Sequence, residues 1–186
     1  MIYIVDLDKT LIPYDTTFFS LNYVLKNRPL SEISKKIIKG KSNFKKYINQ
    51  CVDWNIANLF VSEEVYKFLI LKKKHGHKLF LISGSDNFIV STISKRFGIF
   101  DLAIGSNKIN PKLKYANKLK YIKKIAGKSE WAYLADAYQD SVIWREAQES
   151  VLVSNSRIKF FIISIFMGGK LTQIKPGHAM ISLPNS

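Results

Sequence analysis

Short apolar runs alternate along most of this chain with longer segments of helical periodicity. The first run, Ile2-Tyr3-Ile4-Val5, is apolar on successive residues and rich in β-branched side chains, as expected of a strand buried on both faces. Similar runs recur at residues 79–82, 102–104, 131–135 and 151–153, with helical patterns between them. This alternation predicts right-handed βαβ crossovers and a Rossmann-like, doubly wound parallel sheet of the α/β class.

The alternation is interrupted once, by a long segment of helical pattern between the first strand and the second. We therefore expect residues 1–13 and 61–155 to form a core domain and residues 14–60 to form a small helical cap inserted after the first strand. Ser31 is the expected N-cap of one cap helix. Residues 156–186 break the alternation and are treated as a C-terminal extension. With 47% hydrophobic residues, a chain of 186 residues can bury a core of this size.

The chain is strongly basic, with 29 Lys and Arg against 14 Asp and Glu and a net charge of +15. This charge favours an anionic partner, such as a phosphorylated small molecule, an anionic membrane surface or a lipid-linked substrate. No specific nucleic acid is expected, because the lysines lack the interleaved aromatic residues of single-strand binders. The single cysteine, Cys51, and the absence of a signal-peptide pattern after Met1 predict a cytoplasmic protein.

Two carboxylates follow the first strand at once, in Asp6-Leu7-Asp8-Lys9-Thr10. Side chains alternate along an extended strand, so Asp6 and Asp8 are expected on one side at the carboxyl edge of the sheet, where ligands bind in such folds. Two carboxylates in so small a space repel each other, and Mg²⁺ prefers oxygen ligands of this kind. The segment therefore predicts a magnesium site, with simple turn or capping aspartates as the alternative.

Three further polar segments fall near expected strand ends. Ser83-Gly84 follows the second core strand, and Asp86 is the expected cap of the next helix, whose N-terminal amides would favour a phosphate. Asp136 and Asp140 follow the strand at residues 131–135. The alternatives are purely structural roles: Ser83 as a turn residue and Asp140 as a helix cap. A lysine-rich segment precedes the same strand.

In this order the four segments resemble the motifs of the haloacid dehalogenase (HAD) superfamily, with a C1-type helical cap like that of the phosphoserine phosphatases. The resemblance extends over residues 1–155. It implies that Asp6 attacks phosphorus and forms an aspartyl-phosphate, and that Asp8 is the general acid and then the general base. It also implies a Mg²⁺ site made of Asp6, the backbone carbonyl of Asp8, Asp136 and, through metal-bound water or by orienting the site, Asp140. Thr10, Ser83 and Gly84 would bind the substrate.

The lysine that neutralises the phosphoryl group in this superfamily has several candidates here. The resemblance favours Lys114, because Leu113-Lys114-Tyr115-Ala116-Asn117-Lys118 is similar to the form L-K-G-x-x-K, with Tyr115 in place of the glycine. Lys112 and Lys118 are the alternatives, and most lysines of the segment are expected to be solvated.

The nearest likeness within the superfamily is to HAD domains found beside UbiA-type prenyltransferases, judged from Gly40-Lys41-Ser42-Asn43-Phe44-Lys45 and the spacing of the later motifs. The expected function is a magnesium-dependent phosphatase for a phosphomonoester, either a small metabolite or a lipid-linked phosphate, with the cap selecting the substrate. The alternatives are a phosphotransferase or phosphomutase of the same fold, and a non-catalytic basic protein that binds nucleic acid or membrane.

Overall fold

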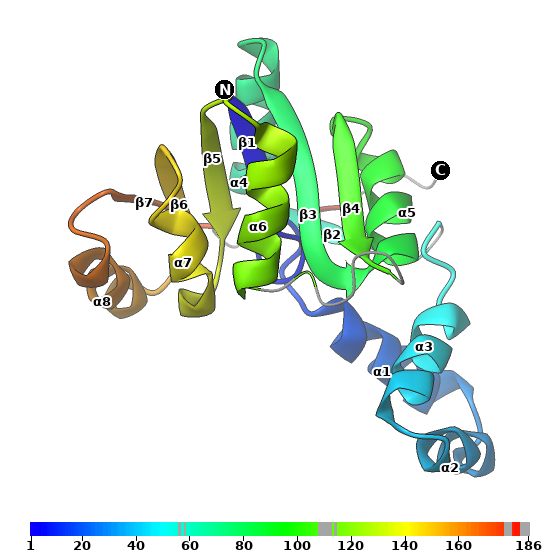
Figure 1. Cartoon of the computed structure of the whole chain (residues 1–186). Helices are drawn as coiled ribbons and strands as arrows, with labels where there is room; N and C mark the ends of the chain where they lie inside the picture. Colours follow the sequence, from blue (N-terminus) through cyan, green and yellow to red (C-terminus); the bar gives the residue numbers. More distant parts are fainter. Residues whose placement is uncertain (56, 58, 108–112, 114, 177–179, 183–186) are drawn as a thin grey trace.

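Six parallel strands form the main sheet of the computed structural model, which describes all residues except 56, 58, 108–112, 114, 177–179 and 183–186. The strand order is β4-β3-β1-β5-β6-β7 (Figure 1). The strand bounds are β1 Ile2–Val5, β3 Lys78–Asp86, β4 Leu102–Ser106, β5 Trp131–Ala135, β6 Glu149–Val153 and β7 Leu171–Ile174. The first strand of the chain therefore lies inside the sheet, between β3 and β5.

Helices cover both faces of this sheet. Helices α4 (Glu63–Lys74) and α5 (Asn87–Phe97) pack on one face, together with Tyr3 and Val5 of β1. Ile2 and Ile4 point to the other face, because side chains alternate along a strand. That face is covered by α6 (Tyr115–Ala126), α7 (Ser141–Trp144) and α8 (Arg157–Phe166). The predicted doubly wound α/β fold is confirmed.

Three helices follow β1 and form the cap: α1 (Thr16–Asn27), α2 (Leu30–Ile38) and α3 (Lys41–Cys51). Figure 1 shows them beyond the carboxyl ends of the strands. Val24, Ile33 and Ile48 form a small hydrophobic core within the cap. The prediction that Ser31 caps a helix is wrong. Helix α2 begins at Leu30, directly after Pro29, whose ring fixes φ at −69° and suits a helix start.

The segment after residue 155, predicted as an extension, contributes to both sheets. Helix α8 leads to β7, which pairs with β6 at the edge of the main sheet. Strand β8 (Met180–Ser182) pairs antiparallel with β2 (Phe60–Ser62), and the Ser62 hydroxyl donates a hydrogen bond of 2.5 Å to the carbonyl of Pro176. Among the described residues, no helix combines the length and hydropathy needed to cross a membrane.

Candidate active site

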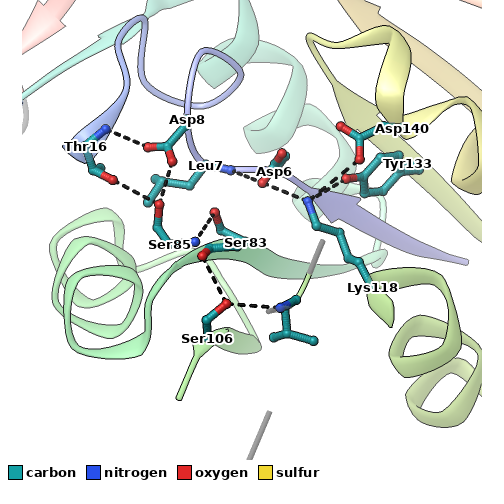
Figure 2. A network of polar contacts seen from close by, with 12 residues as sticks. Asp6, Leu7, Asp8, Thr16, Ser83, Ser85, Ser106, Lys118, Tyr133 and Asp140 are labelled. Atoms are coloured by element: carbon teal, nitrogen blue, oxygen red, sulfur yellow. Dashed lines mark hydrogen bonds and ion pairs between the residues drawn. The ribbon is translucent and has the colours of Figure 1, made fainter. Parts of the chain in front are cut away.

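Asp6 lies directly after β1, at the carboxyl edge of the sheet. Its Oδ1 accepts a hydrogen bond of 2.9 Å from the backbone N–H of Leu7 and lies 3.1 Å from Nζ of Lys118 (Figure 2). The Asp6 side chain is 15% exposed and that of Lys118 is 3% exposed, so the carboxylate is the more accessible member of the pair. An ion pair of this kind holds the carboxylate in one orientation at the end of the strand.

Lys118 is the buried lysine of the site, with a side chain only 3% exposed. It extends from α6, donates a hydrogen bond of 2.9 Å to the Tyr133 hydroxyl and lies 4.0 Å from Oδ1 of Asp140. It was an alternative in the sequence analysis. The favoured Lys114, like Lys112, lies outside the described residues, so the preference for it stays a prediction. The signal that could have favoured Lys118 is its helical spacing with Ile122 and Ala126, both buried.

The Asp8 carboxylate points away from Lys118, toward the cap (Figure 2). Its Oδ1 accepts from the backbone N–H of Thr16 at 2.8 Å, and its Oδ2 accepts from the Ser85 hydroxyl at 2.5 Å. The hydroxyls of Thr16 and Ser85 are 2.9 Å apart. Burial raises the pKa of Asp8 above its usual range, although the hydrogen bonds from Ser85 and Thr16 lower it in part and the charge of Asp6 raises it further. The sequence analysis identified neither Ser85 nor Thr16.

The end of β3 supplies hydroxyls and backbone groups to the same place. Ser83 is buried, and its Oγ accepts a hydrogen bond of 3.2 Å from the backbone N–H of Ser85. The Gly84 carbonyl accepts a hydrogen bond from the Ser106 hydroxyl at 3.0 Å. Asp86 accepts from the backbone N–H of Phe88 at 2.9 Å, so its predicted role as N-cap of α5 is confirmed.

Two more carboxylates follow β5. Asp140 is buried, and burial raises its pKa to about 6 against the opposing charge of Lys118. Burial also raises the pKa of Asp136, although its Oδ2 lies 3.7 Å from Nζ of Lys159 on α8. The charge of Asp6 contributes to both shifts, which shows that the three carboxylates repel one another across a small distance.

A cavity of about 300 Å³ joins these groups. Of the predicted residues, it is lined by Asp6, Asp8, Ser83, Gly84, Asp136 and Asp140. Lys118 and Tyr115 contribute to its wall, and the cap adds Asp15, Thr17 and Lys45. Thr10 is buried and instead lines an adjoining cavity of about 290 Å³, and within the described part of the chain its hydroxyl has no hydrogen-bond partner.

Solved structures resemble the chain over nearly its whole length. A protein of unknown function from Bordetella pertussis has a TM-score of 0.69 at 13% identity, covering 95% of this chain and 98% of that one. A haloacid dehalogenase-like hydrolase from Streptococcus pneumoniae has a TM-score of 0.60 at 15% identity, covering 94% of each chain. A phosphoserine phosphatase in its apo form has a TM-score of 0.59 at 15% identity, covering 86% and 89%. The chain has the fold of the haloacid dehalogenase (HAD) hydrolases.

These likenesses confirm the resemblance at the level of fold. No family model and no curated protein matches the sequence, and the identities to the solved HAD structures are low. The narrower likeness to HAD domains beside UbiA-type prenyltransferases stays a prediction. In this chain the HAD fold gathers four carboxylates and one buried lysine at the carboxyl edge of β1, β3 and β5.

The oxygen-rich lining of the cavity fits a magnesium ion. Asp6 and Asp136 face the same cavity and repel each other, which a divalent cation would relieve. Within the ranges that the structure describes, no three acidic, histidine or cysteine side chains form a complete metal cluster. Magnesium needs only one or two carboxylates in addition to water and substrate phosphate. Because Ser85 and Thr16 already engage the Asp8 carboxylate, the backbone carbonyl is the group of Asp8 left for such a shell.

Proposed function

We propose that this chain is a magnesium-dependent phosphatase that hydrolyses a phosphomonoester through an aspartyl-phosphate on Asp6. The observation that carries the proposal is the 3.1 Å contact between the accessible Asp6 carboxylate and the buried ammonium group of Lys118. This ammonium group balances the charge of the carboxylate and offers positive charge to the phosphoryl oxygens that approach it. The fold shared with HAD hydrolases, phosphoserine phosphatases among them, supports the same chemistry.

The reaction has two displacement steps. A carboxylate oxygen of Asp6 attacks phosphorus, the bond from phosphorus to the leaving oxygen breaks, and Asp8 donates a proton to that oxygen. Water then attacks the phosphorus of the aspartyl-phosphate, Asp8 accepts its proton, and the bond to Asp6 breaks to release phosphate. The raised pKa of Asp8 supports this role, because an acid must hold its proton near the working pH before it can donate it.

Ser83 and the backbone around Gly84 would bind the oxygens of the phosphoryl group, next to the N-terminus of α5. Asp6, Asp136 and the backbone carbonyl of Asp8 would hold the magnesium ion, with Asp140 acting through water. When bound, magnesium would neutralise charge on the phosphoryl oxygens. Lys118 is the lysine that we assign to the site.

The substrate class is set by the cap. Lys45 of α3 and Thr17 of α1 line the same cavity as the carboxylates, so they would contact the leaving group of a small metabolite or of a lipid-linked phosphate. Hydrolysis is favoured over phosphotransfer by Asp8, which α1 and β3 hold in place as a base for water. A cytoplasmic location fits this function, since Cys51 is a free thiol.

The test is the hydrolysis of p-nitrophenyl phosphate with and without magnesium, combined with acid-quench trapping of a phosphorylated protein. We expect turnover that needs magnesium, an acid-stable phosphoryl group on Asp6, and a loss of roughly 10³-fold or more in Asp6→Asn. Asp53→Asn, at an exposed aspartate of the cap, is the matched control and should retain turnover. Unchanged turnover in Asp6→Asn would overturn the mechanism. Release of the phosphoryl group only to an added alcohol would assign a phosphotransferase instead.

A further inference from the structure

Helix α8 is apolar on two opposite faces. Its inner face packs Ile163 and Met167 into the core beside the sheet. Its outer face exposes five large apolar side chains, with exposed fractions from 48% to 74%: Ile158, Phe161, Ile162, Ile165 and Phe166. At about 100° per residue, these five lie within one arc of about 140°. We call them the α8 surface. A helix packed on a sheet normally presents polar side chains to water on this outer face, so the α8 surface is exceptional.

Basic side chains surround the α8 surface. Arg157 is exposed and Lys159 partly exposed on the flanks of the helix, and the exposed Lys170 follows it. The last acidic residue of the sequence is Glu149, so the segment that contains α8 has positive charges and no negative ones. Lys159 pairs with Asp136, so Arg157 and Lys170 give the rim of the α8 surface its net positive charge, and a partner that covers it must be both apolar and anionic.

The α8 surface also contacts the turn whose residues Asp136, Ala137, Gln139 and Asp140 line the active-site cavity. The ring of Phe166 contacts the ring of Tyr138 edge-on, with centroids 5.5 Å apart. Tyr138 itself is 45% exposed and lies in the turn between Asp136 and Asp140. Lys159 lies 3.7 Å from Asp136. Whatever binds the α8 surface therefore comes to lie beside the edge of the sheet that carries the carboxylates.

We propose that the α8 surface docks on an anionic membrane. A helix with Phe and Ile on one face and Lys or Arg at its sides inserts into the boundary between headgroups and acyl chains. Helix α8 has 10 residues and is far shorter than the roughly 20 needed to span a bilayer, so it would lie in the plane of the surface. A second copy of this chain is a poorer partner for the α8 surface, because two molecules of net charge +15, each with a cationic rim, would repel each other.

The test is flotation of the full chain with lipid vesicles, without magnesium or substrate, so its outcome is independent of the proposed function. We expect binding to vesicles of phosphatidylglycerol and phosphatidylcholine, little binding to pure phosphatidylcholine, and loss of binding as salt increases. The double variant Phe161→Ser/Ile165→Ser should lower the bound fraction by about 10-fold or more. The matched control is Leu71→Ser on α4, which removes a side chain that is 50% exposed and should leave binding unchanged.

A second variant keeps the test independent of any packing change in α8. Arg157→Gln/Lys170→Gln leaves the apolar residues in place. It should weaken binding to the anionic vesicles and leave the weak binding to pure phosphatidylcholine unchanged. The proposal is overturned if the wild type does not float with anionic vesicles, or if the Phe161→Ser/Ile165→Ser variant floats as well as the wild type. It is also overturned if sedimentation velocity shows a dimer that this variant dissociates, because the α8 surface would then bind a second copy.

Discussion

Lys118 occupies a position on α6 that the helix otherwise gives to apolar residues. It shares the buried stripe of the helix with Ile122 and Ala126, and its ammonium group is removed from water. A buried charge is costly unless it is paired and hydrogen-bonded, and here Asp6 and the Tyr133 hydroxyl provide both. Asp6, the proposed nucleophile, therefore also stabilises the buried charge of Lys118.

This arrangement predicts which lysine acts in the reaction. Lys118→Met keeps the volume of the side chain and removes the charge, so the catalytic rate constant should fall about 10²-fold or more. Lys114→Met tests the lysine that the resemblance favours and should change the rate less than about threefold, because Lys118 already pairs with Asp6. Steady-state kinetics on p-nitrophenyl phosphate compares the two. The opposite ranking would assign the role to Lys114.

Tyr115 has a left-handed backbone conformation, with φ of +48°. The HAD motif to which this segment is similar has glycine at the position, and glycine adopts such a φ without the steric penalty of a side chain. Tyr115→Gly should therefore raise the free energy of unfolding by about 0.5–1 kcal/mol. Ala116→Gly, within the same helix, should lower it by about 1 kcal/mol. Urea titration measures both, and a destabilised Tyr115→Gly would show that packing of the ring outweighs the strain.

At the level of elements, the end of β3 is shaped by its neighbour β4. The register between the two strands shifts between Ile82 and Asp86, in the segment that carries Ser83 and Ser85. Gly105 of β4 makes this approach possible, because a Cβ at Gly105 would lie 2.6 Å from the carbonyl oxygen of Ser85 and 2.7 Å from Cα of Asn87. The position of the Ser85 hydroxyl, which donates a hydrogen bond to Asp8, thus depends on the absence of a side chain at Gly105 of β4.

Gly105→Ala should therefore damage the site as well as the fold. The added methyl group forces backbone against backbone, which should cost about 1–3 kcal/mol of stability and displace Ser85 from Asp8. Gly76→Ala is the matched control: Gly76 also tolerates a side chain poorly, at φ of +77°, but it meets no atom within 4 Å and lies in the turn before β3. Both variants should melt earlier, and only Gly105→Ala should lose turnover at a temperature where both are folded. Equal turnover in the two would contradict this coupling.

The sequence predicted the elements whose signals are local. The strands β1 and β5 match their expected ranges, because continuous apolar runs specify burial directly. It did not reveal Ser85 or Thr16 as partners of Asp8, since their contacts join residues 77 and 8 positions apart. The periodicity of apolar residues indicates which apolar side chains are buried, but it does not indicate which Ser or Thr side chains are buried. Strand β7 was missed for a related reason, as an edge strand has a weaker apolar pattern than a central one.

The whole molecule carries a net charge of +15, yet its cavity concentrates carboxylates. Burial raises the pKa of Asp136 and Asp140, and repulsion by Asp6 adds to both shifts. A cation in the cavity would relieve this repulsion in the folded state only. Folding stability should therefore depend on magnesium, independently of any substrate.

Thermal unfolding with and without magnesium tests this dependence. A concentration tenfold above the dissociation constant should stabilise the fold by about 1.4 kcal/mol, which raises Tm by about 3–6 °C. Asp136→Asn should raise the metal-free Tm, because it removes one repelling charge, and should abolish most of the magnesium shift. The control is Asp101→Asn, which should keep the full shift. The Asp101 carboxylate does not line the cavity, and it lies 2.6 Å from Nζ of Lys73. An unaltered shift in Asp136→Asn would exclude Asp136 as a ligand.

The position of β1 inside the sheet has a consequence for synthesis. Strand β1 is made first, but its neighbours β3 and β5 begin at Lys78 and Trp131. At about 5–20 residues per second, the ribosome needs roughly 6–25 s to make the residues between β1 and β5. During that interval the apolar Ile2-Tyr3-Ile4-Val5 run has no partner on one or both sides, as is usual for folds of high contact order. The nascent chain therefore exposes for a long interval a strand that is fully buried in the folded protein, and a chaperone that binds short apolar segments would engage it there.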